Sequence, residues 1–239
     1  MPGLRVTDEI FDRYPEAVLG VVTVHGIDNS GNGDALLGPL RHEEARLRER
    51  LAGVQLTEHP HIAPWRDAYR AFGAKPKDHP SSIENLVRRV LKGQPVPRVS
   101  PLVDLYNTIS LRHLVPVGGE DLDRVEGEVL LTFATDHEAP VRLLGEAEAR
   151  PPKPGEVIYR DDLGTLCRRW NWKEAERTKL TAATRHAFLV IEGLRPVGRD
   201  LVRQAAEELA ALVRTHCGGG GQVVLIDPDH PRAPFAHTA

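Results

Sequence analysis

Residues 103–110, with the sequence VDLYNTIS, carry polar side chains at a spacing that could build part of a ligand site. On a helix, Asp104 and Asn107 share a face with Ser110 or Leu111, because side chains three or four positions apart are neighbours. A carboxylate and an amide among apolar positions are unusual core choices, since burial without partners costs about 1–3 kcal/mol. The spacing therefore favours a ligand-binding role for Asp104, Asn107 and Ser110.

A run of glycines and acids follows at residues 116–121, PVGGED. Gly118 and Gly119 would let a ligand approach the backbone N–H groups closely, because glycine has no Cβ. Glu120 and Asp121 then stand where their carboxylates could bind an amine. The alternative interpretation is a helix that ends in a tight turn with exposed acids. The residues alone leave both interpretations open.

The segment CRRWNW, residues 167–172, holds two of the three tryptophans of the chain. If it continues a strand from Gly164, successive side chains point to opposite faces. One face then carries Cys167, Arg169 and Asn171, and the other carries Arg168, Trp170 and Trp172. The first set is typical of a pocket, and the two tryptophans of the second are typical of a packed core or a stacking surface.

Common catalytic motifs are missing from the sequence. It has no GK[ST] phosphate loop, no GxSxG elbow and no HExxH or CxxC metal signature. The two cysteines, Cys167 and Cys217, are too few for a disulfide framework. His59 and His61 are separated by a proline and lack further ligands nearby. We therefore predict no metal site, no cofactor and no covalent nucleophile.

The net charge is −3, which argues against a protein that coats nucleic acid by bulk attraction. The segment from Arg66 to Arg98 nevertheless has a local net charge of +5, from eight basic and three acidic residues. Such a patch could contact phosphates, or it could be an ordinary solvated helical face. Both interpretations are compatible with the sequence.

The hydrophobic pattern predicts helices before a region of short strands, which indicates an α+β fold with a mostly antiparallel sheet. Ser81 is expected as a helix N-cap, with Glu84 closing a capping box. We expect helices over residues 39–51, 63–72, 81–93, 101–113 and 196–216. We expect strands over residues 17–25, 128–135, 141–145, 156–159, 164–170, 186–192 and 222–227.

The chain of 239 residues is long enough for one domain, or for two intimately packed subdomains, which we place at residues 1–227. The proline-rich residues 228–239 are expected to form a flexible tail. The sequence shows neither a signal peptide nor an apolar run of membrane-spanning length, so a cytoplasmic location without membrane contact is predicted.

The two polar segments, in this order, resemble a known module. Residues 97–131 (PRVSPLVDLYNTISLRHLVPVGGEDLDRVEGEVLL) resemble the B3/B4 domain, the editing module of the phenylalanyl-tRNA synthetase β subunit. Residues 164–194 resemble its later editing-site loop and the strand that follows. The chain as a whole is similar to freestanding B3/B4 proteins that have no synthetase catalytic domain.

This resemblance implies a pocket between the B3 and B4 portions that takes the acceptor end of tRNA and hydrolyses a wrong amino acid from it. Asn107 matches the pocket asparagine, and Arg98 lies within one residue of the pocket arginine. Gly118 and Gly119 stand where bacterial synthetases have a histidine, and Trp170 or Asn171 stands near their editing-loop glutamate. Because an aminoacyl ester is already activated, a positioned water and a stabilised oxyanion would suffice for hydrolysis.

The patterns and the resemblance together assign residues to three roles. The predicted catalytic residues are Asn107, Glu120, Asp121 and Asn171. The predicted substrate-binding residues are Arg98, Asp104, Ser110, Gly118, Gly119, Arg169, Trp170 and Trp172. The predicted RNA-binding residues are Lys75, Lys77, Arg88, Arg89 and Lys92. The expected function is a trans-editing deacylase of mischarged aminoacyl-tRNA, with a non-catalytic tRNA-binding or amino-acid-binding module as the alternative.

Overall fold

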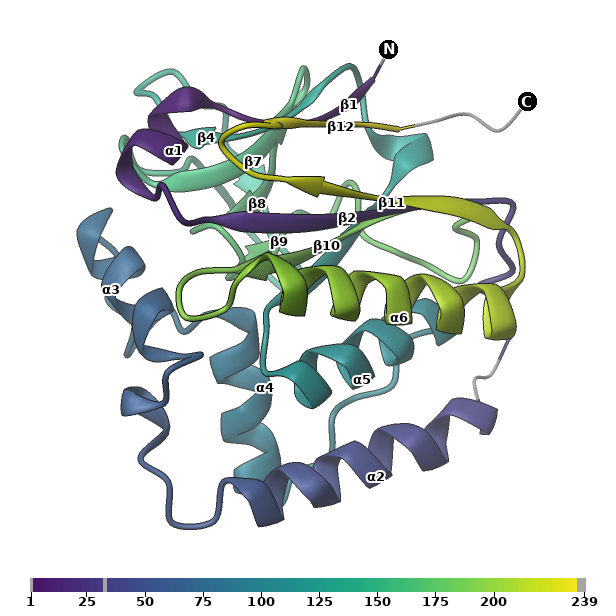
Figure 1. Ribbon diagram of the computed structural model, residues 1–239. Helices are drawn as coiled ribbons and strands as arrows, with labels where there is room; N and C mark the ends of the chain where they lie inside the picture. The colour runs from purple at the N-terminus through teal and green to yellow at the C-terminus, as the bar shows by residue number, and fades with distance from the viewer. Residues whose placement is uncertain (1, 32–33, 236–239) are drawn as a thin grey trace.

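Two β-sheets and a set of helices are stacked in layers in the computed structural model (Figure 1), which describes residues 2–31 and 34–235. The six-stranded sheet has the order β12 (Arg232–Pro234), β1 (Gly3–Val6), β4 (Val129–Phe133), β7 (Val157–Asp161), β8 (Gly164–Arg168) and β9 (Lys173–Glu174). The four-stranded sheet has the order β11 (Gly220–Ile226), β2 (Val18–His25), β10 (His186–Gly193) and β3 (Val117–Asp121). A small hairpin pairs β5 (Val141–Arg142) with β6 (Ala149–Arg150).

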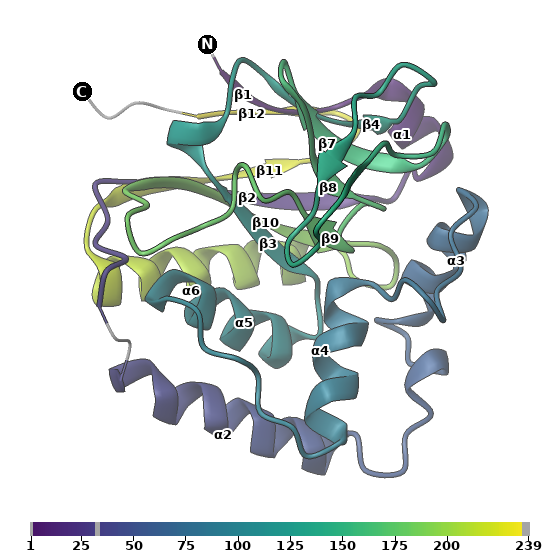
Figure 2. The same cartoon turned by 180° about the vertical axis from the view of Figure 1, so that it is seen from behind.

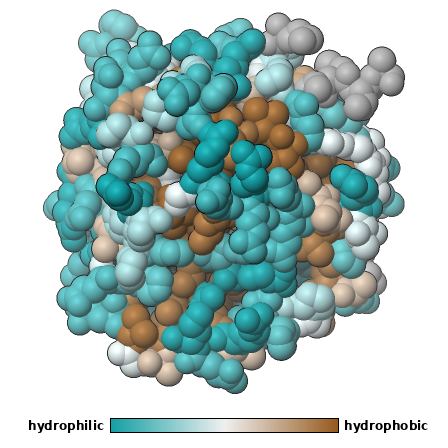
Figure 3. Space-filling view, in the orientation of Figure 1, coloured by the Kyte–Doolittle hydropathy of each residue, from teal (hydrophilic) through white to brown (hydrophobic). Residues whose placement is uncertain are grey.

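The helices gather mainly beneath the four-stranded sheet, on the side away from the six-stranded sheet (Figures 1 and 2). Their bounds are α1 (Asp8–Arg13), α2 (Asp34–Arg50), α3 (Ala63–Ala71), α4 (Ser82–Leu91), α5 (Pro101–His113) and α6 (Arg199–Cys217). Two short 3-10 turns, η1 (Leu56–Glu58) and η2 (Leu122–Arg124), complete the described elements. Figure 3 shows that hydrophilic side chains cover much of one face, with smaller hydrophobic areas among them.

The four-stranded sheet has a hydrophobic core on each face because its strands alternate. In β10, Phe188 and Val190 pack with the core between the two sheets, whereas Leu189 and Ile191 pack with the core beneath. The lower core includes Ile109 of α5. Strand β10 is paired on both sides, with β2 and with β3. This central strand therefore contributes side chains to both hydrophobic cores.

The α+β prediction is confirmed, and most elements lie where the sequence predicts them. The helix expected at 101–113 is α5, with the same bounds. The helix expected at 39–51 is α2, but it begins earlier, at Asp34, and Pro39 lies inside it. Helix α1 and strands β1, β3, β6, β9 and β12 were not predicted. The antiparallel pattern is interrupted where β1 pairs with β4 in parallel.

The prediction of a flexible tail over 228–239 is wrong for the residues described up to 235. Ala233 in β12 pairs with Leu4 of β1. Phe235 is buried, and its ring stacks on Phe188 with centroids 4.8 Å apart. Burial of these apolar side chains, together with the strand pairing, orders this segment. Residues 236–239 of the predicted tail lie outside the described residues.

The N-cap predicted at Ser81 is present, because its Oγ accepts a hydrogen bond from the Glu84 N–H at 3.4 Å. Glu84 does not reach back in a capping box, since its buried carboxylate binds Arg66 and Arg88, each at 2.5 Å. We expect Ser81→Ala to lower the free energy of unfolding by about 1 kcal/mol, because an N–H of the first turn loses its acceptor. Urea unfolding monitored by circular dichroism measures this loss. A Ser30→Ala variant, at an exposed loop position, is the control.

Candidate functional site

A cavity of about 190 Å³ lies between the two sheets, above β3 and β10 and beside β7, β8 and β9. One wall comes from the turn after β8, residues 170–172, together with Ser82 at the start of α4. Figure 2 shows β9 close to β3 and β10, although these strands belong to different sheets. The apolar part of the lining consists of Val117, Leu144, Tyr159, Cys167, Trp170, Trp172, Phe188 and Val190.

Three glutamates on the lining make the cavity acidic. Strand alternation places Glu120 beside its register partner Phe188, and Glu192 four residues beyond Phe188 on the same face. Glu174 approaches from β9 in the other sheet. Lys173, the one lysine or arginine on the described lining, forms an ion pair with Glu146 at 2.9 Å. The carboxyl groups therefore have no arginine or lysine partner on the cavity wall.

Glu192 is the centre of a buried hydrogen-bond network. Its carboxyl group accepts hydrogen bonds from the Tyr159 hydroxyl and from Asn171 Nδ2, the latter at 2.6 Å. The Tyr69 hydroxyl donates to Asn171 Oδ1 at 2.9 Å, which fixes the orientation of the amide. Burial raises the pKa of Glu192 to about 7, against the effect of the Tyr159 and Asn171 hydrogen bonds. Asn171 is thus held rigidly at the cavity wall.

Glu120 and Glu174 form a second acidic pair whose members differ in environment. Burial, followed by the negative charge of Glu174, raises the pKa of Glu120 well above its ordinary value. Burial also raises the pKa of Glu174 to about 7, while a hydrogen bond from the Gly119 N–H opposes the rise. Glu120 therefore favours its protonated form more than an ordinary glutamate does, and Glu174, whose pKa is about 7, is divided between its two protonation states at neutral pH. Such a separation of two pKa values suits acid and base roles.

The two glycines of β3 have a structural role that the sequence did not predict. A Cβ on Gly119 would lie 2.3 Å from Leu189 Cδ2, so only glycine fits against β10 there. A Cβ on Gly118 would lie 3.3 Å from Glu174 Oε1. Gly118 and Gly119 therefore allow a carboxyl group from the other sheet to approach the β3 backbone. Both residues line the cavity, as does Glu120.

One buried polar atom on the cavity wall, Ser82 Oγ, has no hydrogen-bond partner among the described residues. Trp170 interacts with Glu192, and Thr178 with Glu120, since each of these contacts lowers the pKa of its glutamate. A buried donor or acceptor left unpaired costs about 1–3 kcal/mol, so such atoms are uncommon in a finished core. The unpaired hydroxyl of Ser82 and the three carboxyl groups together favour a site that binds a polar ligand.

The strand predicted through CRRWNW ends earlier than expected. Strand β8 stops at Arg168, and the next two residues, Arg169 and Trp170, have positive φ angles of 49° and 64°. The chain therefore turns, and strict alternation fails from Arg169 onward. Asn171, Trp170 and Trp172 line the cavity, but Arg169 does not. The guanidinium carbon of Arg169 lies over the Trp172 ring, 4.3 Å from the ring centroid. Arg169 lines a neighbouring cavity instead.

The predicted role of α5 in the site is not supported, because this helix packs beneath the four-stranded sheet. Asn107 is buried on α5 and is not part of the cavity lining. Asp104 accepts a hydrogen bond from Arg98 at 3.1 Å, which ties the helix to the preceding loop. Ser110 Oγ donates to the Val115 carbonyl at 2.6 Å. Asp104, Asn107 and Ser110 share one helix as predicted, but none of them lines the cavity.

Asp121 and Arg98 likewise lie away from the cavity. The Asp121 carboxylate accepts from the Asp123 N–H at 3.0 Å and from Thr184 Oγ1 at 2.6 Å, so it anchors the turn after β3. Arg98 forms an ion pair with Asp34 at 3.2 Å in addition to its bond with Asp104. Alternation explains the difference between the two neighbouring acids, because Glu120 and Asp121 point to opposite faces of β3.

The basic segment is only partly available to a ligand. Arg88 is bound to Glu84, and Arg89 donates to the Pro95 carbonyl at 2.6 Å. Lys75, Lys77 and Lys92 are exposed. The prediction of RNA contacts therefore retains physical support at the three lysines and less at the two arginines.

Sequence reasoning missed Glu174, Glu192 and Tyr159. A glutamate within the apolar run HAFLVIEG was a usable signal, because a charged side chain in a buried strand requires a partner or a function. Glu174 lies on a strand of two residues, which no periodicity can reveal. Its place in the site depends on how the two sheets pack.

The raised pKa values predict that folding stability falls as the pH rises through neutrality. A carboxyl group with a folded pKa near 7 and an ordinary value of 4.5 stabilises the fold below about pH 4.5 and loses that contribution above about 7. The loss is up to about 3 kcal/mol per carboxyl group. We expect Glu192→Gln to reduce the difference in unfolding free energy between pH 5 and pH 8.5, measured in urea.

The matched control for this experiment is Glu207→Gln at an exposed position on α6. It should keep the wild-type pH dependence. Equal pH dependence in Glu192→Gln and the wild type would contradict the prediction.

None of the helices in the described residues is both long enough and apolar enough to cross a bilayer. Among the same residues, no three His, Cys, Asp or Glu side chains form a group that could hold a metal ion.

Comparison with known proteins identifies the family. The model of the B3/4 domain matches residues 64–218, which is more than half of the chain. No curated protein matches. Among solved structures, an N-terminal fragment of the phenylalanyl-tRNA synthetase β-subunit from Pyrococcus horikoshii is similar at 15% identity and a TM-score of 0.46, covering 92% of this chain. The chain spans about half of that structure, 49% of its length. The family match confirms the resemblance seen in the sequence: the chain belongs to the B3/4 domain family.

Proposed function

We propose that this protein is a cytoplasmic aminoacyl-tRNA deacylase, which binds the acceptor end of a tRNA and hydrolyses the ester of a misattached amino acid. The observation that carries the proposal is the acidic cavity between the sheets. It combines two buried carboxyl groups, the half-buried carboxyl group of Glu174, an apolar wall and the unpaired hydroxyl of Ser82. Membership of the B3/4 family supports a tRNA-related role.

The cavity suits the amino-acid end of such a substrate. An aminoacyl ester has a free α-ammonium group, which requires anionic or hydrogen-bond acceptor partners when it is buried. The carboxyl groups of Glu192 and Glu174 on the cavity wall can supply such partners. The apolar side chains Phe188, Val190 and Leu144 can contact the side chain of the amino acid. The volume of about 190 Å³ is far above the roughly 10–15 Å³ that one water molecule requires.

The hydrolysis needs only a water molecule, a base and a donor. We assign the base to Glu174, because its pKa of about 7 leaves a large carboxylate fraction at neutral pH. Glu174 takes a proton from water while the water oxygen bonds to the ester carbonyl carbon. Glu120, whose raised pKa favours the protonated form, donates a hydrogen bond to the oxygen that becomes negative. The bond to the ribose oxygen then breaks, and the proton held by Glu174 moves to that oxygen.

Asn171 has a positioning role in this scheme. Its amide is held between Tyr69 and Glu192, so it presents a fixed polar edge to the cavity. This assignment keeps Glu120 and Asn171 of the four predicted catalytic residues. It replaces Asn107 and Asp121 with Glu174, because only the last lies on the cavity wall.

The test is deacylation of a panel of correctly charged and mischarged tRNAs by the purified protein. We expect one or more mischarged tRNAs to lose their amino acid faster than in buffer, and Asn171→Ala to slow this reaction. If every aminoacyl-tRNA in the panel decays at the buffer rate, the deacylase proposal fails. Retained binding of aminoacyl-tRNA in that case would favour the non-catalytic binding module.

A further inference from the structure

A second cavity lies beside the first and has a different chemical character. It encloses about 250 Å³ between the segment after α3, residues 72–79, and the loop before β7. Arg169 forms part of its lining. The Trp172 ring, which lines the first cavity, contacts Arg169 at 4.3 Å and His79 at 4.6 Å between centroids. The two cavities therefore share the wall built by residues 169–172.

Arg169 is buried, strained and incompletely paired. Its exposed fraction is 8%, its φ is 49°, and its Nη1 atom is buried without a hydrogen-bond partner. Its nearest carboxylate contact joins Nε to Glu156 Oε2 at 3.9 Å, too long for a hydrogen bond. A non-glycine residue with positive φ is costly, and such strain is often associated with function. A guanidinium with a free buried donor requires an acceptor that the described chain does not supply.

Glu156 cannot be that acceptor, because Arg168 already occupies it. The two side chains form a bidentate pair, with Nε and Nη2 of Arg168 each 2.8 Å from a Glu156 oxygen. Glu156 also accepts from the Arg169 backbone N–H at 3.1 Å. Burial favours a raised pKa for Glu156, but the bonds and charges of Arg168 and Arg169 lower it. Glu156 is therefore ionised, and Arg168 neutralises its negative charge. The positive charge of Arg169 is then not balanced by this carboxylate.

The remaining lining adds donors and positive charge. His79 Nδ1 is another buried atom without a partner, and Lys75 and Lys153 are exposed lining residues. Asp78 is the second carboxylate on the lining, after Glu156. Four cations, counting Arg168 behind the wall, thus face two carboxylates. Unpaired donors and excess positive charge are what a phosphate group requires.

We infer that this second cavity is a phosphate subsite, in which Arg169 binds a phosphate of the nucleotide that carries the amino acid in the first cavity. The source of the phosphate rests on the proposed function, whereas the anion site rests on the contacts of Arg169 and His79. Trp172 would then separate the amino-acid end of the substrate from its nucleotide end. Lys75 and Lys153 would contact the phosphate from the solvent side.

Titration with inorganic phosphate, followed by calorimetry and thermal unfolding, tests the subsite. Sodium chloride keeps the ionic strength constant, because phosphate contacts depend on salt. We expect saturable phosphate binding by the wild type and at least tenfold weaker binding by Arg169→Gln. Arg203→Gln, at an exposed position on α6, is the matched control and should bind as the wild type does. Phosphate binding no stronger than that of chloride would overturn the subsite.

Two exposed variants guard against misfolding of Arg169→Gln. Lys75→Gln and Lys153→Gln should each weaken phosphate binding several-fold, and wild-type affinity in both would contradict the proposed lining. A single-stranded RNA ending in CCA is the second probe, and tighter binding than inorganic phosphate identifies nucleic acid as the source. Equal binding of the two probes indicates a site for free phosphate and overturns the link to the substrate.

This experiment and the deacylation assay fail independently. A protein that deacylates tRNA but does not bind phosphate refutes the subsite alone. A protein that binds phosphate through Arg169 but leaves every aminoacyl-tRNA intact refutes the deacylase and retains the anion site.

Discussion

Glu174→Gln should slow the hydrolysis of a mischarged aminoacyl-tRNA by about 10²–10³-fold. The substitution keeps the size and one hydrogen-bond acceptor of the side chain but removes the group that takes a proton from water. General-base catalysis typically contributes about 10²–10⁴-fold to a rate. The wild-type rate should rise with pH and level off above about 7, because only the carboxylate form of Glu174 is active. Single-turnover deacylation between pH 5.5 and pH 8.5 measures both effects.

The matched control is Glu148→Gln, at an exposed carboxylate that forms an ion pair with Arg150 at the surface. It should retain the wild-type rate and pH profile. Glu174→Gln should keep only the slow rise that buffer hydrolysis shows. A Glu174→Gln rate within threefold of the wild type would remove Glu174 from the mechanism.

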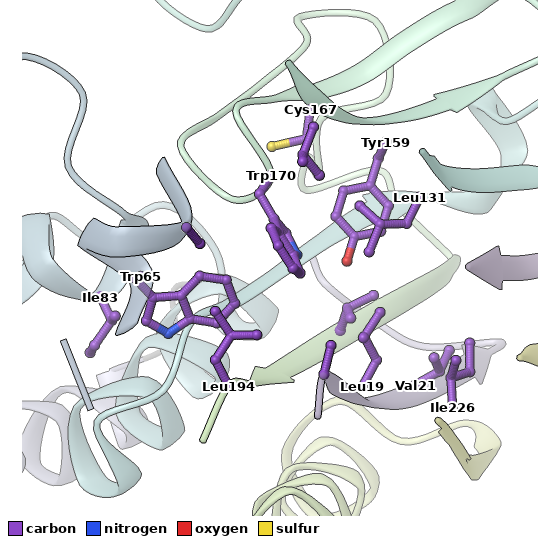
Figure 4. Close-up of a cluster of buried hydrophobic side chains, with 14 of the residues drawn as sticks. Leu19, Val21, Trp65, Ile83, Leu131, Tyr159, Cys167, Trp170, Leu194 and Ile226 are labelled. Atoms are coloured by element: carbon purple, nitrogen blue, oxygen red, sulfur yellow. The ribbon is translucent and has the colours of Figure 1, made fainter. Parts of the chain in front are cut away.

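Trp170→Ala should lower the free energy of unfolding by about 3–5 kcal/mol. The substitution removes a large, fully buried side chain where the helices meet the core between the two sheets. Trp170 is fully buried, and Figure 4 shows it between Trp65 and Tyr159. Its ring meets Trp65 edge-on with centroids 5.1 Å apart, and Tyr14 at 4.9 Å. Aromatic contacts of this kind add to the burial term. Urea unfolding followed by far-ultraviolet circular dichroism measures the loss.

Leu163→Ala serves as the control for this substitution, since Leu163 has an exposed fraction of 63%. Its effect should stay within about 0.5 kcal/mol. A loss below 1 kcal/mol for Trp170→Ala would show that the turn after β8 does not depend on this ring for its position.

The sequence predicted most of the helices but missed α1, the start of α2 and several short strands. The helix at 101–113 and the cap at Ser81 follow from local signals, namely proline, serine and apolar spacing, which act within one or two turns. Strand β3 was not predicted, and Gly118 and Gly119 have low strand propensity. Their presence in a strand is a consequence of contacts with Leu189 and Glu174, which are distant in sequence.

The candidate site was predicted in part for the same reason. Asn171, Glu120 and the two glycines were identified, and they lie together on one cavity. The position of Arg169 was wrong, because alternation assumes extended backbone and two residues here have positive φ. Asn107 was placed on the wall of the site because helical spacing shows which residues share a face, but not which layer that face meets. Glu174 and Glu192 required the packing of two sheets to be known.

The arrangement of β10 and β9 has a consequence for how this site can change during evolution. Strand β10 is central in its sheet and packs on two cores, so a substitution there disturbs the whole fold. Strand β9 is an edge strand of two residues, and the turn that precedes it is short. Changes at this edge can reshape one wall of the cavity without altering strand register. The site thus joins a floor that two cores constrain to a wall at a sheet edge, and ligand preference within such proteins should vary with Leu144 and Lys173, which line the cavity at this edge and have no proposed catalytic role.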